Sequence, residues 1–531
     1  MGTAGFCGLP LVADNLPPAG FSLPYPFERP IFRHVHPVGS PNATISSRGD
    51  RTDRVPMIGR SFVTTLLVWT AAAAAIAAQP TAEKAPGARP EQIARVAEPG
   101  DLVVEMQAHR RSGVVSAWLV NGIRVHHRRM TVQPDQIEVM ISFAGGELLE
   151  CPETRGLSLL CAALLDRPSS RAIAQEDIRQ RLEGRDVLIE GGAMHDSLLV
   201  RVSGAAADIR AGIEVAASAL SSPLVTEDSM VIARTAACDD VKRTQNDARW
   251  SVTEPLLELV TPINECRNKL ACTKRMGMYT AEQATNWVVR HAGSSPCEIA
   301  IVGDIEANEA IAMIAEVFAK FPARPRASPA ALAQQRAVPK QHGPFAKNVG
   351  CKGEAKIEEA HVLAGFLSPD PSEVQEVRRL RAGARVLAKR LEVRLRELKL
   401  GGDPHVSWTY MPSPFAGRSV TVVAASVTPG DAESVKRVMQ ASMCELMDNG
   451  LPADELAQST EVLARVAAAY ERDPRYWAAI LARSTSGGLD PEQISDGPET
   501  YRAMKPDEVL AAMRRACTIE NRLDLVVRPA Q

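Results

Sequence analysis

The fold is indicated first by one short apolar stretch, Gly156-Leu157-Ser158-Leu159-Leu160-Cys161-Ala162-Ala163-Leu164-Leu165. Its composition predicts a helix on which positions 159 and 163 share one face, with position 162 beside them. That spacing would suit a metal site. Leucine and alanine, however, have no lone pairs for a metal, and no carboxylate stands there to activate a bound water. Cys161 does not restore the face, because it lies about 200° around the helix from Leu159.

The composition is that of an ordinary globular protein. With 531 residues the chain is too long for one core, so roughly two to four domains are expected. The formal net charge of −2 gives no case for a nucleic-acid partner or an anionic membrane surface. Aromatic residues make up only 4% of the chain, which disfavours a platform for stacking single-stranded bases.

The N-terminal hundred residues contain no predicted domain. Residues 1–56 lack periodicity, and we expect a disordered tail or an upstream extension. Residues 57–78 combine a basic start, an apolar run and Ala75-Ile76-Ala77, which is the layout of a cleaved signal peptide. Export to the periplasm or the extracellular space follows, with an uncleaved membrane anchor as the alternative. Residues 79–100 are predicted to be a linker, and no second long apolar run indicates a further membrane segment.

Ten cysteines are present, and nine of them follow the signal segment. They form no Cys-x-x-Cys pair and no Cys/His cluster with zinc-ligand spacing, so a structural zinc is not expected. Cys266 and Cys272 are close enough in sequence to form a disulfide in an oxidising compartment.

One pattern occurs twice. The segment from Ser197 reads as a strand, a turn, a helix, a break at Pro223 and another helix, and the same order follows from Ser419. Chance reuse of a common strand–helix unit is the alternative. Upstream, Trp118 to Val125 predicts a hairpin around an Asn-Gly turn, and the alternating residues 137–143 predict a half-buried strand.

The predicted organisation is therefore an N-terminal half at 101–325, a linker at 326–354 and a C-terminal half at 355–531. Each half combines a mixed or antiparallel sheet with packed helices, which is an α+β fold. Such a chain can build two separate cores of similar architecture.

These landmarks, taken in order, resemble the insulinase/pitrilysin-like metallopeptidases, particularly their mitochondrial processing peptidase-like branch. Further points of similarity are Val302-Gly303-Asp304-Ile305 and the pair Arg396-Glu397 before Gly401-Gly402. The resemblance covers roughly residues 101–529 and implies two similar halves that close like a clamshell around an extended peptide. In the family's inverted zinc motif, the two histidines would fall on Leu159 and Ala163, and the glutamate on Ala162.

Other family positions depart as well. The third zinc ligand, which follows near the end of a later helix, would fall on Asp240, with Asp239 as the alternative. One carboxylate does not make a zinc site, and a solvated face is the simpler interpretation. Arg396 matches a substrate-orienting arginine, while the tyrosine that should accompany it falls near Pro404 or His405. His126-His127 read as part of a basic run up to Arg129, since neighbours on a strand point to opposite faces.

The sequence thus predicts a catalytically inactive, exported member of this family without a cofactor. It would bind a peptide or an unfolded protein segment, or pair with an active relative that supplies the zinc; strand-edge pairing would provide affinity. An active zinc metalloendopeptidase with an atypical site is the second hypothesis, and a scaffolding protein without peptide binding is the third.

Overall fold

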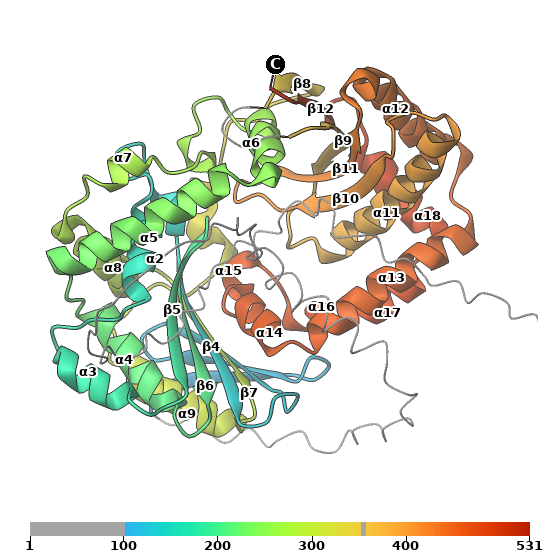
Figure 1. Ribbon diagram of the computed structural model, residues 1–531. Coiled ribbons are helices and arrows are strands. Elements are labelled where there is room, and N and C mark those ends of the chain that lie inside the picture. Colours follow the sequence, from blue (N-terminus) through green and yellow to red (C-terminus); the bar gives the residue numbers. More distant parts are fainter. Residues whose placement is uncertain (1–100, 352–356, 531) are drawn as a thin grey trace, which may run out of the picture. The chain divides into compact units, whose positions relative to one another are not determined.

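The computed structural model describes residues 101–351 and 357–530 (Figure 1). The predicted extension at 1–56, signal peptide at 57–78 and linker at 79–100 lie outside the described residues. Within the described ranges, no helix has both the length and the apolar character needed to span a bilayer.

The first half contains a seven-stranded sheet in the order β1-β2-β3-β7-β4-β6-β5. The predicted hairpin is confirmed: β2 and β3 are antiparallel around Asn121-Gly122, where Gly122 has a φ of 86° that suits glycine. The strands are β1 (Val103–His109), β2 (Val114–Leu119), β3 (Arg124–Arg129), β4 (Gln136–Ala144), β5 (Val187–Ala193), β6 (Ser197–Ala205) and β7 (Cys297–Gly303). The helices of this half are α2 (Leu157–Leu165), α3 (Gln175–Leu182), α4 (Ile209–Ser221), α5 (Glu227–Gln245), α6 (Ala248–Val260), α7 (Thr273–Met276), α8 (Ala281–Ser294) and α9 (Ala307–Phe318).

The second half contains a five-stranded sheet in the order β10-β11-β9-β12-β8. Its strands are β8 (Phe345–Gly350), β9 (Ala360–Ser368), β10 (His405–Met411), β11 (Ser419–Val427) and β12 (Arg522–Arg528). Its helices are α11 (Val374–Glu397), α12 (Ala432–Asn449), α13 (Ala453–Glu471), α14 (Pro474–Leu481), α15 (Ser484–Gly487), α16 (Pro491–Ile494), α17 (Gly497–Ala503) and α18 (Pro506–Ala516).

The segment predicted as a linker, 326–354, is partly structured. It contains η3 (Pro329–Leu332), α10 (Ala333–Arg336) and β8, and β8 pairs in parallel with β12. The sequence pattern of β8 is weak because β8 is an edge strand with alternating exposed residues. Such a strand needs few apolar side chains. The remaining short elements are η1 (Gly146–Leu149), η2 (Cys266–Asn268) and η4 (Pro429–Asp431).

The two halves share one topology. In the first sheet the order β3-β7-β4-β6-β5 has one parallel pair, β3 with β7, and antiparallel pairs elsewhere. The second sheet repeats this as β8-β12-β9-β11-β10, with β8 and β12 parallel. The strands β6 and β11 begin at Ser197 and Ser419, where the pattern in the sequence repeats. The α+β fold of two similar halves is confirmed.

Each half also packs a helix against the sheet of the other half. Helix α6 packs Val252, Leu256 and Val260 against apolar side chains of the second sheet. Helix α14 packs Trp477 and Leu481 against the first sheet. The two halves therefore exchange one covering helix each.

This exchange corrects one prediction. Strand β4 was expected to be half-buried, but both of its faces are buried. The odd-numbered residues from Ile137 to Phe143 face the main core of the first half, which its own helices and sheet form. Met140, on the other face, packs in the cluster that contains Trp477. The alternation of residue types in β4 could not reveal a covering helix that follows much later in the chain.

Candidate functional site

Helix α2 lies where the sequence predicts it. It begins after Gly156, which has a φ of 97°, a left-handed conformation that favours glycine. A Cβ atom at this position would stand 2.7 Å from Ala271 Cβ, so the close packing also requires glycine. The start of the helix is therefore fixed by the backbone as well as by its apolar side chains.

The face that would hold zinc is made of hydrocarbon. Leu159 and Ala163 are half-buried and pack against the main core, and Ala162 is buried. The helix lies directly on β5, since a Cβ atom on Gly191 would stand only 2.0 Å from the Ala162 carbonyl oxygen. The residues present do not fit a zinc ion, because none of the three side chains can coordinate one.

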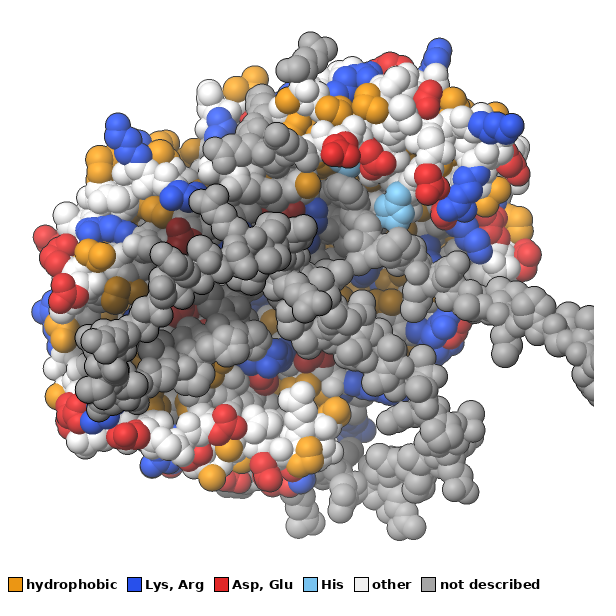
Figure 2. Space-filling view, in the orientation of Figure 1, with side chains coloured by type: hydrophobic (Ala, Val, Ile, Leu, Met, Phe, Trp, Pro, Cys, Tyr) orange, Lys and Arg blue, Asp and Glu red, His pale blue; other side chains and the backbone are white. Residues whose placement is uncertain are grey.

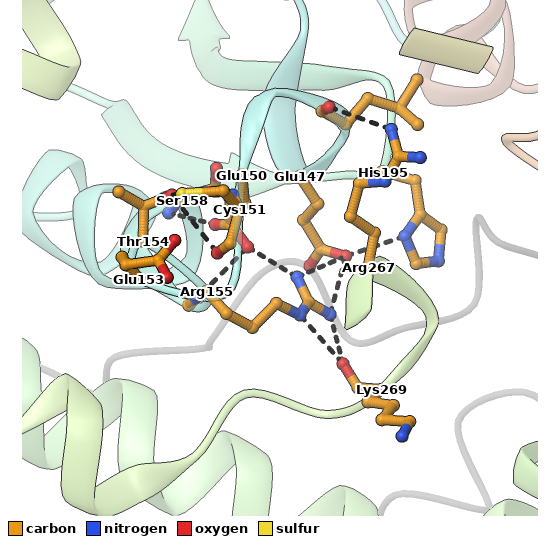
Figure 3. Close-up of polar contacts among 12 residues, drawn as sticks. Glu147, Glu150, Cys151, Glu153, Thr154, Arg155, Ser158, His195, Arg267 and Lys269 are labelled. Carbon is orange, nitrogen blue, oxygen red and sulfur yellow. Dashed lines mark hydrogen bonds and ion pairs between the residues drawn. The ribbon is translucent and has the colours of Figure 1, made fainter. Parts of the chain in front are cut away.

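A charged cluster holds the N-terminal end of α2 (Figure 3). The Glu150 carboxylate accepts hydrogen bonds from the backbone N–H groups of Gly156 and Ser158, at 3.0 and 2.8 Å. Arg155 donates to Glu150 at 2.6 Å and to Glu147 at 3.4 Å. A carboxylate at a helix N-terminus satisfies amide groups that have no partner within the helix.

His195 extends this cluster toward solvent. Its Nδ1 atom lies 2.7 Å from Glu147 Oε2, and its side chain is 24% exposed. Figure 3 shows the second ring nitrogen turned away from the cluster. The contact between Glu147 and His195 thus joins the end of β4 to the turn between β5 and β6.

The electrostatics of the cluster follow from its burial. Burial raises the pKa of Glu150, repulsion from Glu147 adds to this rise, and Arg155 opposes it. Burial disfavours the Arg155 cation, but the two carboxylates outweigh that effect and raise its pKa. One guanidinium therefore pairs with both carboxylates and offsets one of their two charges. Within residues 101–351 and 357–530, no group of three or more His, Cys, Asp or Glu side chains is arranged to hold a metal ion.

Strand β5 forms the edge of the first sheet beside α2 (Figure 1). The Gly191 N–H points away from β6 and donates to Asp166 Oδ1 at 2.8 Å. Because backbone groups alternate along an antiparallel strand, Ile189 and Ala193 present their N–H and C=O groups on the same outer side. Asp166 therefore takes up the outward N–H group of Gly191, one of the hydrogen-bonding positions on this edge.

The other predicted site residues, Asp240 and Arg396, form ion pairs with neighbours on their own helices, and α5, which carries Asp240, packs against α2. Asp240, on α5, forms an ion pair with Arg243 at 3.0 Å. Arg396, in the last turn of α11, pairs with Glu392 at 2.5 Å, and its side chain is 57% exposed. The nine described cysteines are free thiols, so Cys266 and Cys272 are not joined by a disulfide in this structure.

The histidines at the start of the basic run, His126 and His127, are not on the surface. Both are almost fully buried on β3, with exposed fractions of 1% and 2%. They do point to opposite sides: His126 lies 3.3 Å from Glu298, and His127 Nε2 lies 3.0 Å from the Ile305 carbonyl oxygen. Burial lowers the pKa of both imidazoles. The sequence could not show this, because the helices that bury β3 come from distant segments.

The residues Glu147, Glu150 and Arg155 were not predicted from the sequence as part of any site. A signal was present, since acidic residues directly before an apolar helical stretch favour its N-terminus. The pairing of these carboxylates with Arg155 depends on the turn between them, which no local pattern specifies.

Comparison with known proteins gives a match to one family model. Residues 279–463, about a third of the chain, match the family model described as Peptidase M16 inactive domain. This segment is similar to the M16 inactive domain, and the described part of the chain has the fold of M16-like structures. The resemblance predicted from the sequence is confirmed at this level. The matched residues begin after α2, so this match is independent of the degenerate helix. A search of curated proteins gave no match.

Solved structures share the fold. The peptidase M16 inactive domain from Pseudomonas fluorescens has 17% identity and a TM-score of 0.63, with 81% of this chain and 99% of that chain covered. The periplasmic protease PqqL from Escherichia coli has 16% identity and a TM-score of 0.66, with coverages of 87% and 50%. The Ferredoxin Protease FusC E83A mutant in complex with Arabidopsis ferredoxin has 13% identity and a TM-score of 0.61, with coverages of 81% and 46%. The chain thus spans about half the length of PqqL and of FusC.

Proposed function

We propose that this M16-like homologue is an exported protein without peptidase activity that binds extended peptide segments. The observation that carries the proposal is the hydrocarbon face of α2 beside the outer edge of β5. An extended peptide can add to such an edge through backbone hydrogen bonds, whereas hydrolysis would need a metal-activated water that Leu159, Ala162 and Ala163 cannot supply.

The comparisons support parts of this proposal. The matched family description names an inactive domain. One structural neighbour is a periplasmic protease, which supports export, and another is a protease in complex with a protein, which supports a polypeptide ligand. Figure 2 shows Lys and Arg side chains interspersed with Asp and Glu on the face in view, a pattern that does not favour nucleic acid. Pairing with an active relative is also part of the proposal.

The test combines zinc content, binding and turnover on one purified sample. We expect substoichiometric zinc, saturable binding of a fluorescein-labelled unfolded peptide, and no cleavage products by mass spectrometry. Near-stoichiometric zinc with cleavage would contradict the proposal and favour an active enzyme. Absence of binding would favour a scaffold.

A variant of the strand edge makes the test specific. Ala193→Pro removes an outward N–H group and should weaken binding of the unfolded peptide by about ten-fold, since a lost backbone hydrogen bond costs about 1–1.5 kcal/mol. Ala193→Ser keeps the N–H group and is the matched control. Fluorescence anisotropy measures both affinities, and circular dichroism verifies that both variants fold. Equal affinities for the two variants would exclude β5 as the binding edge.

A further inference from the structure

A pocket of about 730 Å³ lies in the second half, and none of its lining residues comes from α2 or β5. It is lined by the carboxyl end of β9, the start of α11, the loop before β11, the segment 338–342 and the connection between α18 and β12. Its volume falls within the range of about 300–1,000 Å³ that is usual for small-ligand sites. By topology, this junction of β9 and α11 corresponds to the junction of β4 and α2 in the first half.

One wall of the pocket contains a buried cation, Arg418. It is 4% exposed and donates to the carbonyl oxygens of Pro339 and Gln341, at 2.8 and 3.4 Å. Among the described residues it forms no ion pair, and burial lowers its pKa. A buried charge is costly unless an opposite charge compensates it, so a bound anion would stabilise this side chain.

The other charges of the pocket do not compensate Arg418. Three cations (Lys340, Arg418 and Arg515) and three glutamates (Glu373, Glu376 and Glu520) line it. Arg515 pairs with Glu376 at 2.6 Å, and Glu520 lies 3.5 Å from His342. A ligand carboxylate would give the buried Arg418 the opposite charge that no lining glutamate supplies.

A hydrogen-bond acceptor lies beside these cations. The Oε1 atom of Gln341, another lining residue, is buried and has no hydrogen-bond partner among the described residues. An unsatisfied buried oxygen favours a ligand that brings an N–H donor. The pocket thus offers cationic donors and one acceptor together, which is the complement of a carboxylate next to an amide.

We propose that this pocket binds the free C-terminal end of a peptide, with Lys340 and Arg418 facing its carboxylate and Gln341 accepting from its last amide N–H. The inference rests on the proposed function only in taking a peptide as ligand. Its site is on the other half, so binding there does not need the edge of β5.

The test uses a tetrapeptide labelled with fluorescein at its N-terminus, made either as the free C-terminal acid or as the C-terminal amide. We expect the acid to bind the full chain at least about ten-fold more tightly, because only the acid brings a negative charge to Lys340 and Arg418. A third peptide with an internal glutamate and an amidated end separates a terminal from a side-chain carboxylate. It should bind as weakly as the amide.

Matched variants locate the site. Lys340→Glu should weaken binding of the acid by at least about ten-fold, whereas Lys320→Glu, an exposed lysine after α9 in the first half, should not. Gln341→Leu should weaken it as well. Ala193→Pro, on the edge of β5, should leave the affinity for this short peptide unchanged, which distinguishes this site from that of the proposed function. Equal binding of acid and amide, binding of neither, or a Lys340→Glu variant with parental affinity would overturn the inference.

Discussion

At the scale of residues, the charged side chains next to α2 stabilise the start of the helix, whereas the face that would hold zinc has no ligand. Arg155 lies between Glu147 and Glu150 at the start of α2, and the helix itself presents leucine and alanine where a metal would need nitrogen or oxygen. That Leu159, Ala162 and Ala163 offer a metal no donor atom follows from the sequence alone, because it depends only on their side-chain chemistry. The charged cluster could not be predicted from the sequence, because His195 contacts Glu147 from a turn that is distant in the chain.

Buried histidines give the protein a pH-dependent stability. Burial lowers the pKa of His127 to about 4, whereas its value in the unfolded chain is near 6.5. Below pH 6.5 the unfolded chain therefore binds a proton that the folded protein does not, so stability is present above that pH and falls as the pH is lowered toward 4. His127→Gln retains a donor for the Ile305 carbonyl oxygen and should reduce this fall by up to about 1.4 kcal/mol per pH unit.

Urea unfolding at a series of pH values, from about 7 down to about 4.5, measures this difference. His342→Gln is the matched control, since that side chain is 55% exposed. A His127→Gln variant whose free energy of unfolding falls as steeply as that of the parent would refute the assignment.

At the scale of elements, the repeat in sequence predicted the repeat in structure. The strand β6 and the helices α4 and α5 return as β11, α12 and α13, and Asp247 and Asp473 cap the following helices, α6 and α14, in the same way. Local patterns sufficed for these elements because capping residues and apolar periodicity act within one or two turns. They could not show which sheet each helix covers, since an apolar stripe does not specify its partner.

The exchanged helix α14 should contribute strongly to stability through Trp477. This side chain is fully buried, Arg128 stacks on its ring at 3.8 Å from the centroid, and its indole N–H donates to the Glu471 carbonyl oxygen. Trp477→Ala should lower the free energy of unfolding by about 3–5 kcal/mol. Tyr470→Ala, whose side chain is 42% exposed, should cost about 1 kcal/mol or less. Denaturant titration compares the two, and similar losses would show that α14 is weakly held.

At the scale of the whole molecule, each half has a main core of its own, and a second apolar cluster on the other face of each sheet is shared between the halves. Val252 and Leu256 of the first half belong to the core of the second sheet, and Trp477 and Leu481 of the second half belong to that of the first. The sequence predicted two halves and a linker between them. It could not predict that each half completes the other, because the apolar residues responsible are indistinguishable in sequence from those of an ordinary core helix.

The packing of α6 and α14 across the two halves predicts cooperative unfolding. When either half melts, the other loses a helix that covers its sheet, so neither is expected to remain folded alone. Differential scanning calorimetry should therefore record one heat-absorption peak for the described part of the chain, and two well-separated peaks would contradict this. The variant Trp477→Ala should move that peak to lower temperature without splitting it.

The reciprocal packing of α6 and α14 has a consequence for fragments of this protein. A polypeptide that ends between the halves would keep a helix with no sheet to cover and a sheet with a bare apolar face. Two such fragments, expressed apart, would each be prone to aggregate, and mixing them would offer each the one surface that fits. Co-expressed fragments should therefore reassemble into a nicked but native-like protein.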